Sequence, residues 1–402
     1  MSSNARFWKN SNGNIGIMLG LAMVPLMLGA GAAIDFGRAS YARTVLQGAA
    51  DAAAIAGATS KDKSASRLQT IVEQYLAANH ADNAVKYMTK IEQSVDSETG
   101  TFNVLVEGSM PTTFMAVAGI KTMDVGVRSQ VNIGTQTMEI ALVLDNTGSM
   151  AGSKIADLKT SAINLVDIIE KETSGNGDTK IAVVPFAEYV NVGTSTGSPS
   201  WLDTSGIGKA TWNGCVGSRS KPNDLSLGAP SEKYPAVAGV PCNVQVLPLT
   251  GDMASVRSRI NLMSAKGSTY IPTGLLWGWN VLDKSVPFTE GLSKGQLKAK
   301  KARRAIILMT DGENTISPTY PAHNGSNPAA SNANLAALCN NVKGDEVEIF
   351  TVSFMVPSVT IKKILENCAT APASYFDAVN SADLNKAFAN IARDLAAVRL
   401  SQ

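Results

Sequence analysis

The chain has 402 residues, of which 45% are hydrophobic and 17% charged, and its formal net charge is +2. This length is sufficient for two or three domains with a sizeable core. The charge is too balanced to indicate a highly basic or acidic partner, so we expect neither nucleic acid nor a strongly acidic substrate.

Residues 15–34 form an uncharged apolar stretch of about twenty residues, the length of a helix that crosses a bilayer. Residues 1–14 contain Arg6 and Lys9, which favours a cytoplasmic amino terminus. Two arginines that follow the stretch weaken this charge argument, so the orientation depends mainly on the cysteines described below. A cleaved secretory signal is an alternative, because Ala30-Gly-Ala32 is a small-residue cleavage pattern.

Residues 35–60 continue as a helix with many alanines, whose small side chains allow another helix to approach closely. The pattern from Asn12 through this run resembles the amino-terminal region of TadG-like proteins of the Flp (tight adherence) pilus-assembly system. Related prepilin-like members carry a Glu shortly after the processing Gly, whereas residues 15–19 contain none. Cleavage after Gly13 is therefore not expected. The alternative is a plain signal anchor with an Ala-rich stalk.

Residues 61–135 predict a small α+β module. Periodicity indicates a helix over 66–79 and strands over 86–95, 101–107 and 123–133. The segment from Met110 to Met115 is also similar to the pilus-assembly group. His80, at the helix end, is expected to be a cap or surface residue.

The stretch from Met138 to Met150 predicts a buried parallel strand that ends in a polar turn, followed by a helix over 154–170. The turn carries Asp145, Thr147 and Ser149 at alternating positions. In open parallel sheets ligands bind beyond the carboxyl ends of the strands, and oxygen ligands suit a hard divalent cation, Mg²⁺ first. Taken alone, such a turn is more often just a helix N-cap, because all three residue types satisfy free amides there.

Two later segments supply further oxygen side chains. Thr269 lies in a loop before a helix, and Asp311 ends an apolar strand within Thr310-Asp-Gly312. Together with the Asp145 turn, these segments resemble a von Willebrand factor type A domain and its metal-ion-dependent adhesion site. The resemblance implies an α/β fold with a Rossmann-like, doubly wound, mostly parallel sheet.

The resemblance also implies a role for each of the five residues. The hydroxyls would bind Mg²⁺, or Mn²⁺ or Ca²⁺, directly, the two aspartates would act largely through water, and a partner's carboxylate would complete the metal shell. Thr147 stands where the family usually has Ser. Both residues offer a hydroxyl, so the ligand should be retained.

We expect this domain to occupy residues 136–402, with an insertion over 191–250 rich in Gly, Ser, Pro and Asn. The four cysteines fall as Cys215 with Cys242 and Cys339 with Cys368, without a C-x-x-C metal spacing. Two disulfides and an oxidising compartment are expected, with four reduced buried cysteines as the alternative. The tryptophans of the insertion indicate either a binding surface near the metal or a small core of its own.

The other elements expected in this domain alternate between strands and helices. They are a strand over 180–186, helices over 252–263 and 275–282, a strand over 346–354 and a closing helix over 382–399. The basic run over 298–304 is expected to be a solvated approach to the sheet. His323 is close enough in sequence to Asp311 to lie at the rim of the site, but no zinc-ligand spacing surrounds it.

Enzymatic alternatives fit poorly. A haloacid-dehalogenase-type phosphotransferase needs an Asp two residues after its nucleophile, and Thr147 stands there. Neither a phosphate-binding loop nor a nucleophile elbow surrounds Ser149. The sequence therefore predicts a bacterial inner-membrane protein, with its A-type domain outside the cytoplasm, that binds a protein partner through a cation. A membrane-anchored adhesin or chaperone-like envelope factor with no pilus role is the alternative.

Overall fold

The computed structural model describes most of the chain. The described residues are 14–60, 64–78, 88–96, 101–132, 137–173, 178–194, 200–207, 212–227, 232–242 and 244–396. The chain divides into two compact units, Met1–Gly134 with Val398–Gln402, and Thr135–Ala397. His80, for which a surface or capping role was expected, lies outside the described residues.

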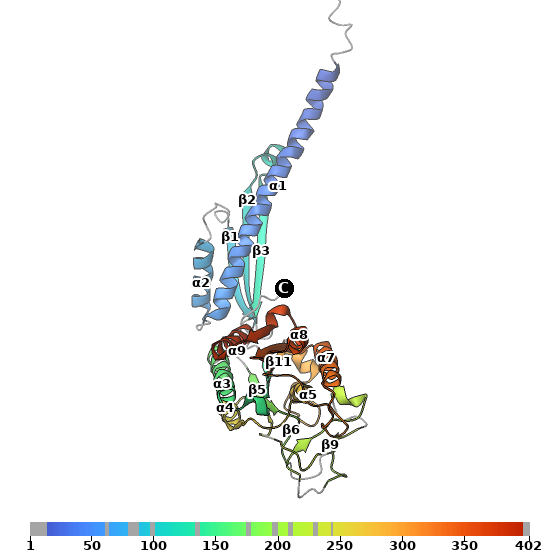
Figure 1. The fold of residues 1–402 in the computed structure, drawn as a ribbon. Helices are drawn as coiled ribbons and strands as arrows, with labels where there is room; N and C mark the ends of the chain where they lie inside the picture. Colours follow the sequence, from blue (N-terminus) through green and yellow to red (C-terminus); the bar gives the residue numbers. More distant parts are fainter. Residues whose placement is uncertain are drawn as a thin grey trace, which may run out of the picture. The chain divides into compact units, whose positions relative to one another are not determined.

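The first unit is built on one long helix, α1 (Asn14–Thr59), as Figure 1 shows. Its second half packs on a three-stranded antiparallel sheet of β1 (Met88–Asp96), β2 (Thr101–Pro111) and β3 (Thr122–Asn132). The helix can lie this close because its buried face consists largely of alanine and glycine. A Cβ added at Gly57 would lie 2.3 Å from a ring carbon of Phe102. The small residues read from the sequence therefore accommodate a sheet as well as a helix.

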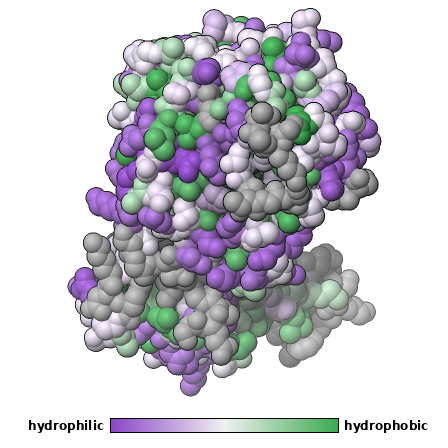
Figure 2. All heavy atoms as spheres, turned by 90° about the horizontal axis from the view of Figure 1, so that it is seen from below, coloured by the Kyte–Doolittle hydropathy of each residue, from purple (hydrophilic) through white to green (hydrophobic). Residues whose placement is uncertain are grey.

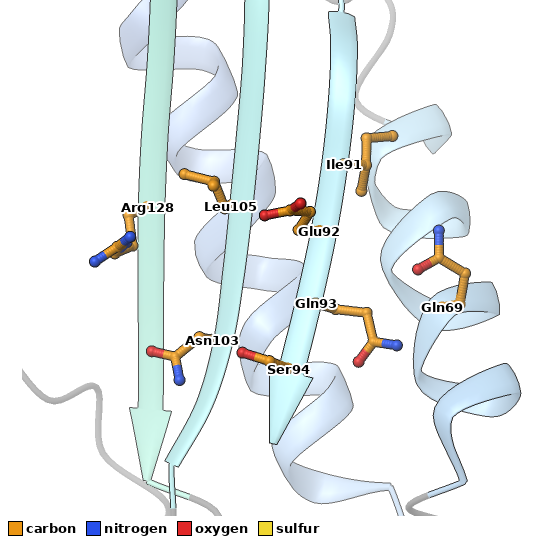
Figure 3. A pocket seen from close by; sticks show the side chains of 8 residues that line it. All are labelled: Gln69, Ile91, Glu92, Gln93, Ser94, Asn103, Leu105 and Arg128. Atoms are coloured by element: carbon orange, nitrogen blue, oxygen red, sulfur yellow. The ribbon is translucent and has the colours of Figure 1, made fainter. Parts of the chain in front are cut away.

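Helix α2 (Ala65–Ala78) completes this unit beside α1 and β1. Leu68, Val72 and Leu76 join the buried face of the sheet and the alanines of α1 in one core. Figure 3 shows α1 behind the strands and α2 at the edge next to β1. A groove of about 620 Å³ is lined by residues of α2 and the three strands, including the polar side chains of Glu92, Asn103 and Arg128. These residues form no catalytic or metal-binding arrangement.

The second unit contains a six-stranded sheet in the order β10-β5-β4-β11-β12-β13. The strands are β4 (Met138–Asp145), β5 (Thr179–Phe186), β10 (Leu247–Thr250), β11 (Arg303–Thr310), β12 (Glu348–Phe354) and β13 (Tyr375–Ala378). All neighbours are parallel except the edge strand β10. In order along the chain this is 3-2-1-4-5-6, the doubly wound arrangement, so the predicted fold class is confirmed.

Helices cover both faces of the sheet, which explains why β4 and β11 are buried at every position. One face packs against α3 (Ser153–Thr173), α4 (Met253–Leu262) and α9 (Ser381–Ala396). The other packs against α5 (Ile271–Leu282), α7 (Pro328–Gly344) and α8 (Val359–Cys368). Helix α5 begins four residues earlier than the sequence predicted, with Pro272 in its first turn, where a missing amide costs no hydrogen bond.

The segment between β5 and β10 contains short strand pairs rather than a separate folded layer. β6 (Val190–Asn191) pairs with β8 (Cys215–Val216), and β7 (Leu202–Asp203) with β9 (Tyr234–Pro235). Trp201 contacts Trp277 of α5 edge to face, with ring centroids 6.4 Å apart. Trp201 and Trp212 thus pack against the core of the unit.

Both expected cysteine pairings are present, as the disulfides Cys215–Cys242 and Cys339–Cys368. The first lies within the inserted segment and the second joins α7 to the end of α8. Each therefore holds together parts of the chain that are nearly thirty residues apart, with separations of 27 and 29.

The end of the basic run was predicted wrongly as solvated. Arg303 and Arg304 are the first residues of β11 and are only 9% and 6% exposed. Arg303 makes a two-pronged contact with Glu348 at 2.8 Å, and Arg304 pairs with Asp345 at 3.4 Å. Because carboxylates from the next strand and its preceding turn neutralise them, two arginines can begin a buried strand.

Candidate metal centre

The site lies where β4 and its neighbour β11 end on the same edge of the sheet. The two strands are parallel and in register, with Leu144 beside Met309, so the residues that follow them are brought together. The loop before α5 joins this edge through two backbone hydrogen bonds. Gly148 N donates to Gly267 O at 2.9 Å, and Lys266 N donates to Asn146 O at 2.9 Å.

Four of the predicted side chains form one continuous hydrogen-bonded chain. Thr147 donates to Asp145 Oδ1 from its backbone N at 2.9 Å and from its hydroxyl at 2.6 Å. The hydroxyls of Thr147 and Ser149 lie 2.9 Å apart, and Ser149 Oγ donates to Asp311 Oδ1 at 2.6 Å. Thr310 Oγ1 donates to the second oxygen of Asp145 at 2.6 Å. The turn is therefore a joint oxygen cluster and not only a helix cap.

The fifth predicted residue, Thr269, lies in the wall of the same pocket. A cavity of about 810 Å³ is lined by Ser149, Thr269 and Asp311 together with neighbouring loop residues. Two hydrogen bonds hold Thr269 against Thr315. The backbone N of Thr269 donates to the Thr315 hydroxyl at 2.9 Å, and the backbone N of Thr315 donates to the Thr269 carbonyl. The cluster thus faces an open cavity that could admit a ligand from outside.

Lys154 is a site residue that the sequence reasoning missed. It lies in the first turn of α3, and its Nζ contacts Asp311 Oδ2 at 2.7 Å. Asp311 is therefore occupied by Ser149 on one oxygen and by an ammonium on the other. Its position five residues after Ser149 could have suggested this role, because the turn returns the first helical residues to the strand ends.

The electrostatics of the cluster favour an added positive charge. Burial raises the pKa of Asp145 to about 6, and the nearby negative charge of Asp311 adds to the rise. A cation held by the cluster would offset the burial and the neighbouring negative charge that raise the pKa of Asp145. Among the described residues no group of three His, Cys, Asp or Glu side chains is placed to hold a metal. Hydroxyl and carboxylate oxygens together are a donor set that fits Mg²⁺, Mn²⁺ or Ca²⁺.

His323 does not line this cavity, contrary to the expectation that it would lie at the rim. Its side chain is buried, with Nε2 2.7 Å from Ser218 Oγ and Nδ1 in contact with the carbonyl of Glu188. The ring stacks on Tyr189 and packs against Tyr270. Burial lowers its pKa to about 4, so the imidazole is neutral at physiological pH.

The strand order, the helices on both faces and the oxygen cluster beyond β4 give the second unit the doubly wound α/β fold that the resemblance to a von Willebrand factor type A domain implied. In the first unit, residues 13–60 match the family model described as "Putative Flp pilus-assembly TadE/G-like". The predicted TadG-like character of the amino-terminal region is therefore confirmed. No curated protein matches the chain.

Several solved structures are similar to this chain at low sequence identity. The vWF domain of the type V pili tip protein Mfa5 from Porphyromonas gingivalis is 13% identical, with 65% of this chain and 95% of that chain covered and a TM-score of 0.39. The pilus adhesin SpaC from Lactobacillus rhamnosus GG is 13% identical, with 76% and 34% covered and a TM-score of 0.40. Proximal thread matrix protein 1 from the mussel byssus, with a zinc-occupied MIDAS motif, is 15% identical, with 65% and 48% covered and a TM-score of 0.38. The chain spans about a third of the length of SpaC.

Proposed function

We propose that the protein is a membrane-anchored binding protein that uses a divalent cation to hold a protein partner, in the assembly or adhesion of a Flp-type pilus. The observation that carries the proposal is the hydrogen-bonded cluster of Asp145, Thr147, Ser149 and Asp311 beside an open cavity. The TadE/G-like match over residues 13–60 supports the pilus setting.

In this proposal the hydroxyls of Thr147, Ser149 and Thr269 hold Mg²⁺ or Mn²⁺, and the aspartates orient them and supply negative charge. The bound cation would attract an acidic side chain, because the cavity on which Ser149, Thr269 and Asp311 open is the accessible side of the site. An Asp or Glu of a partner protein is therefore the proposed last ligand. A hard cation prefers such an oxygen to nitrogen or sulfur.

Binding rather than catalysis is supported by the surroundings of the cluster. Activating a serine nucleophile needs a general base within hydrogen-bond reach. The carboxylate that accepts from Ser149, that of Asp311, is a weak base already paired with Lys154, and the imidazole of the buried His323 is engaged with Ser218 and Glu188. The alternative function is an envelope adhesin or chaperone-like factor without a pilus role. Neighbouring genes for a secretion ATPase and prepilins would favour the pilus function.

The membrane anchor is proposed to be the first half of α1. Among the described residues this is the one helix that is long and apolar enough to cross a membrane, judged by length and composition. Residues 16–30 of α1 are exposed throughout, which distinguishes them from a core helix. The two disulfides support an A-type domain outside the cytoplasm and hence a cytoplasmic amino terminus in the bacterial inner membrane.

Calorimetric titration of the full-length protein in detergent with MgCl2 and MnCl2 tests the metal site. Ser149→Ala and Thr269→Ala each remove one proposed ligand and should weaken binding at least tenfold, whereas Thr147→Ser should bind normally. Ser268→Ala is the matched control, because Ser268 lines the same cavity beside Thr269 but has no proposed metal contact. Equal binding by all variants, or no binding by a folded parent protein, would reject the proposed site.

A further inference from the structure

The connection between β2 and β3 exposes an unusual run of apolar side chains. It includes the short helix η4 (Met115–Ala118), and residues 114–120 contain no charged or strongly polar residue. Phe114, Val117 and Ile120 are 44%, 83% and 46% exposed. By contrast, hydrophobic side chains on the face seen in Figure 2 are scattered among hydrophilic ones. A contiguous exposed apolar segment on a loop usually marks an interaction surface.

This connection is held in a fixed conformation against α1. The buried carboxylate of Asp35 accepts hydrogen bonds from the backbone N of Thr113, Phe114 and Met115 at 2.9, 2.8 and 2.8 Å. Arg38 donates to the Thr113 hydroxyl at 2.6 Å. The apolar side chains are therefore displayed by a rigid support and are not the tip of an untethered loop.

The connection contacts α1 within its apolar stretch. A Cβ added at Gly31 would lie 2.4 Å from Phe114 Cβ, so the phenylalanine packs directly on the helix backbone there. Figure 1 shows the β2–β3 connection beside α1. Gly31 precedes Asp35, the first charged residue after the stretch, by four residues, or about 6 Å of helix. If residues 15–34 cross the bilayer, Phe114 must lie at the depth where the acyl chains begin.

We propose that the β2–β3 connection is a second membrane contact, which enters the interface of the leaflet that α1 leaves. Phe114, Val117 and Ile120 would lie among the outer acyl groups, as the apolar face of an interfacial helix does. Lys121 and Arg38 would reach the phosphates at the polar boundary. A phospholipid surface is the occupant because Phe114 packs on α1 at Gly31, where the neighbouring apolar side chains Leu28 and Ile34 of α1 are also exposed.

The inference depends on the membrane anchor of the proposed function but not on its metal site. Nitroxide labels on single cysteines of the full-length protein in phosphatidylcholine and phosphatidylglycerol liposomes would measure depth, through the accessibility of each label to oxygen and to a water-soluble nickel chelate. Val117→Cys tests the connection. Val95→Cys is the matched control, since Val95 is also exposed but pairs with Phe102 at the opposite end of the sheet. Leu21→Cys tests the anchor.

Lipid contact predicts a nickel accessibility severalfold lower at Val117 than at Val95, with oxygen accessibility raised, as at Leu21. A Val117 label as accessible to nickel as the Val95 label, with Leu21 in lipid, would overturn the inference while retaining the anchor. A Val117 label shielded from both reagents would indicate a protein contact and would also overturn it. A water-accessible Leu21 would reject the anchor and the inference together.

Discussion

Acidification is expected to destabilise the second unit (Thr135–Ala397) through a single buried imidazole, that of His323. The ring joins three parts of the fold, because it contacts Ser218 of the inserted segment, Glu188 and Tyr189 after β5, and Tyr270 before α5. Its pKa is lowered from 6.5 to about 4, with burial as the first cause, and the hydrogen bond to the Glu188 carbonyl partly opposes the shift. Protonation therefore favours the unfolded chain.

The sign and size follow from proton linkage. The folded pKa lies below the unfolded value, so the contribution of the neutral ring is fully present above pH 6.5 and is lost as the pH falls from about 6.5 to about 4. The full shift corresponds to about 3.4 kcal/mol. Between pH 7.5 and pH 5.0 the loss in free energy of unfolding should be about 2 kcal/mol.

Asp145 contributes with the opposite sign. Its pKa is raised to about 6, so the folded unit becomes more stable as this carboxyl is protonated on acidification, and the two effects partly cancel. The raw pH dependence of the protein is therefore not diagnostic. The difference between the parent protein and His323→Gln isolates the imidazole, because Asp145 and all other groups titrate in both.

The assay is urea unfolding at pH 7.5 and pH 5.0 with EDTA present, followed by tryptophan fluorescence. Four of the five tryptophans lie in the second unit. Between pH 7.5 and pH 5.0 the free energy of unfolding of His323→Gln should fall by about 2 kcal/mol less than that of the parent protein. This difference does not depend on the stability of the variant at pH 7.5. Equal losses in both proteins would refute the reasoning, since they would show that His323 titrates normally in the folded state.

Two further predictions concern the site and the core. Lys154→Met should tighten Mg²⁺ binding severalfold in the calorimetric titration, because Lys154 pairs with Asp311 at 2.7 Å and competes with the cation. This ion pair contributes about 1 kcal/mol. Unchanged or weaker Mg²⁺ binding by the variant would contradict the prediction. Gly278→Ala should lower the free energy of unfolding by about 1–3 kcal/mol, because its Cβ would lie 2.4 Å from Val143 Cγ2. The control is Gly295→Ala on α6 (Lys294–Ala299), where an added Cβ meets no other atom and the free energy of unfolding should not fall. Equal effects of the Gly278 and Gly295 substitutions would show that α5 can move away from β4.

The sequence by itself determined the elements whose signals are local. The apolar run that ends at Asp145 predicted a buried strand, and alternation over 101–107 and 123–133 predicted the paired strands of the first unit. The uncharged stretch 15–34 predicted a membrane-spanning helix, and a helix long and apolar enough to cross a membrane is present there. Asp145, Thr147 and Ser149 were also accessible to sequence reasoning, because they lie within five residues on one turn.

Only the tertiary structure decided which distant residues meet. It placed Lys154 on Asp311, buried Arg303 against Glu348 and enclosed His323 between two tyrosines. Periodicity records whether a residue faces the interior, but a charged side chain becomes buried only when another element supplies its partner. Whether such a partner is present depends on strand order and on the packing of segments far apart in the chain, which no local sequence pattern encodes.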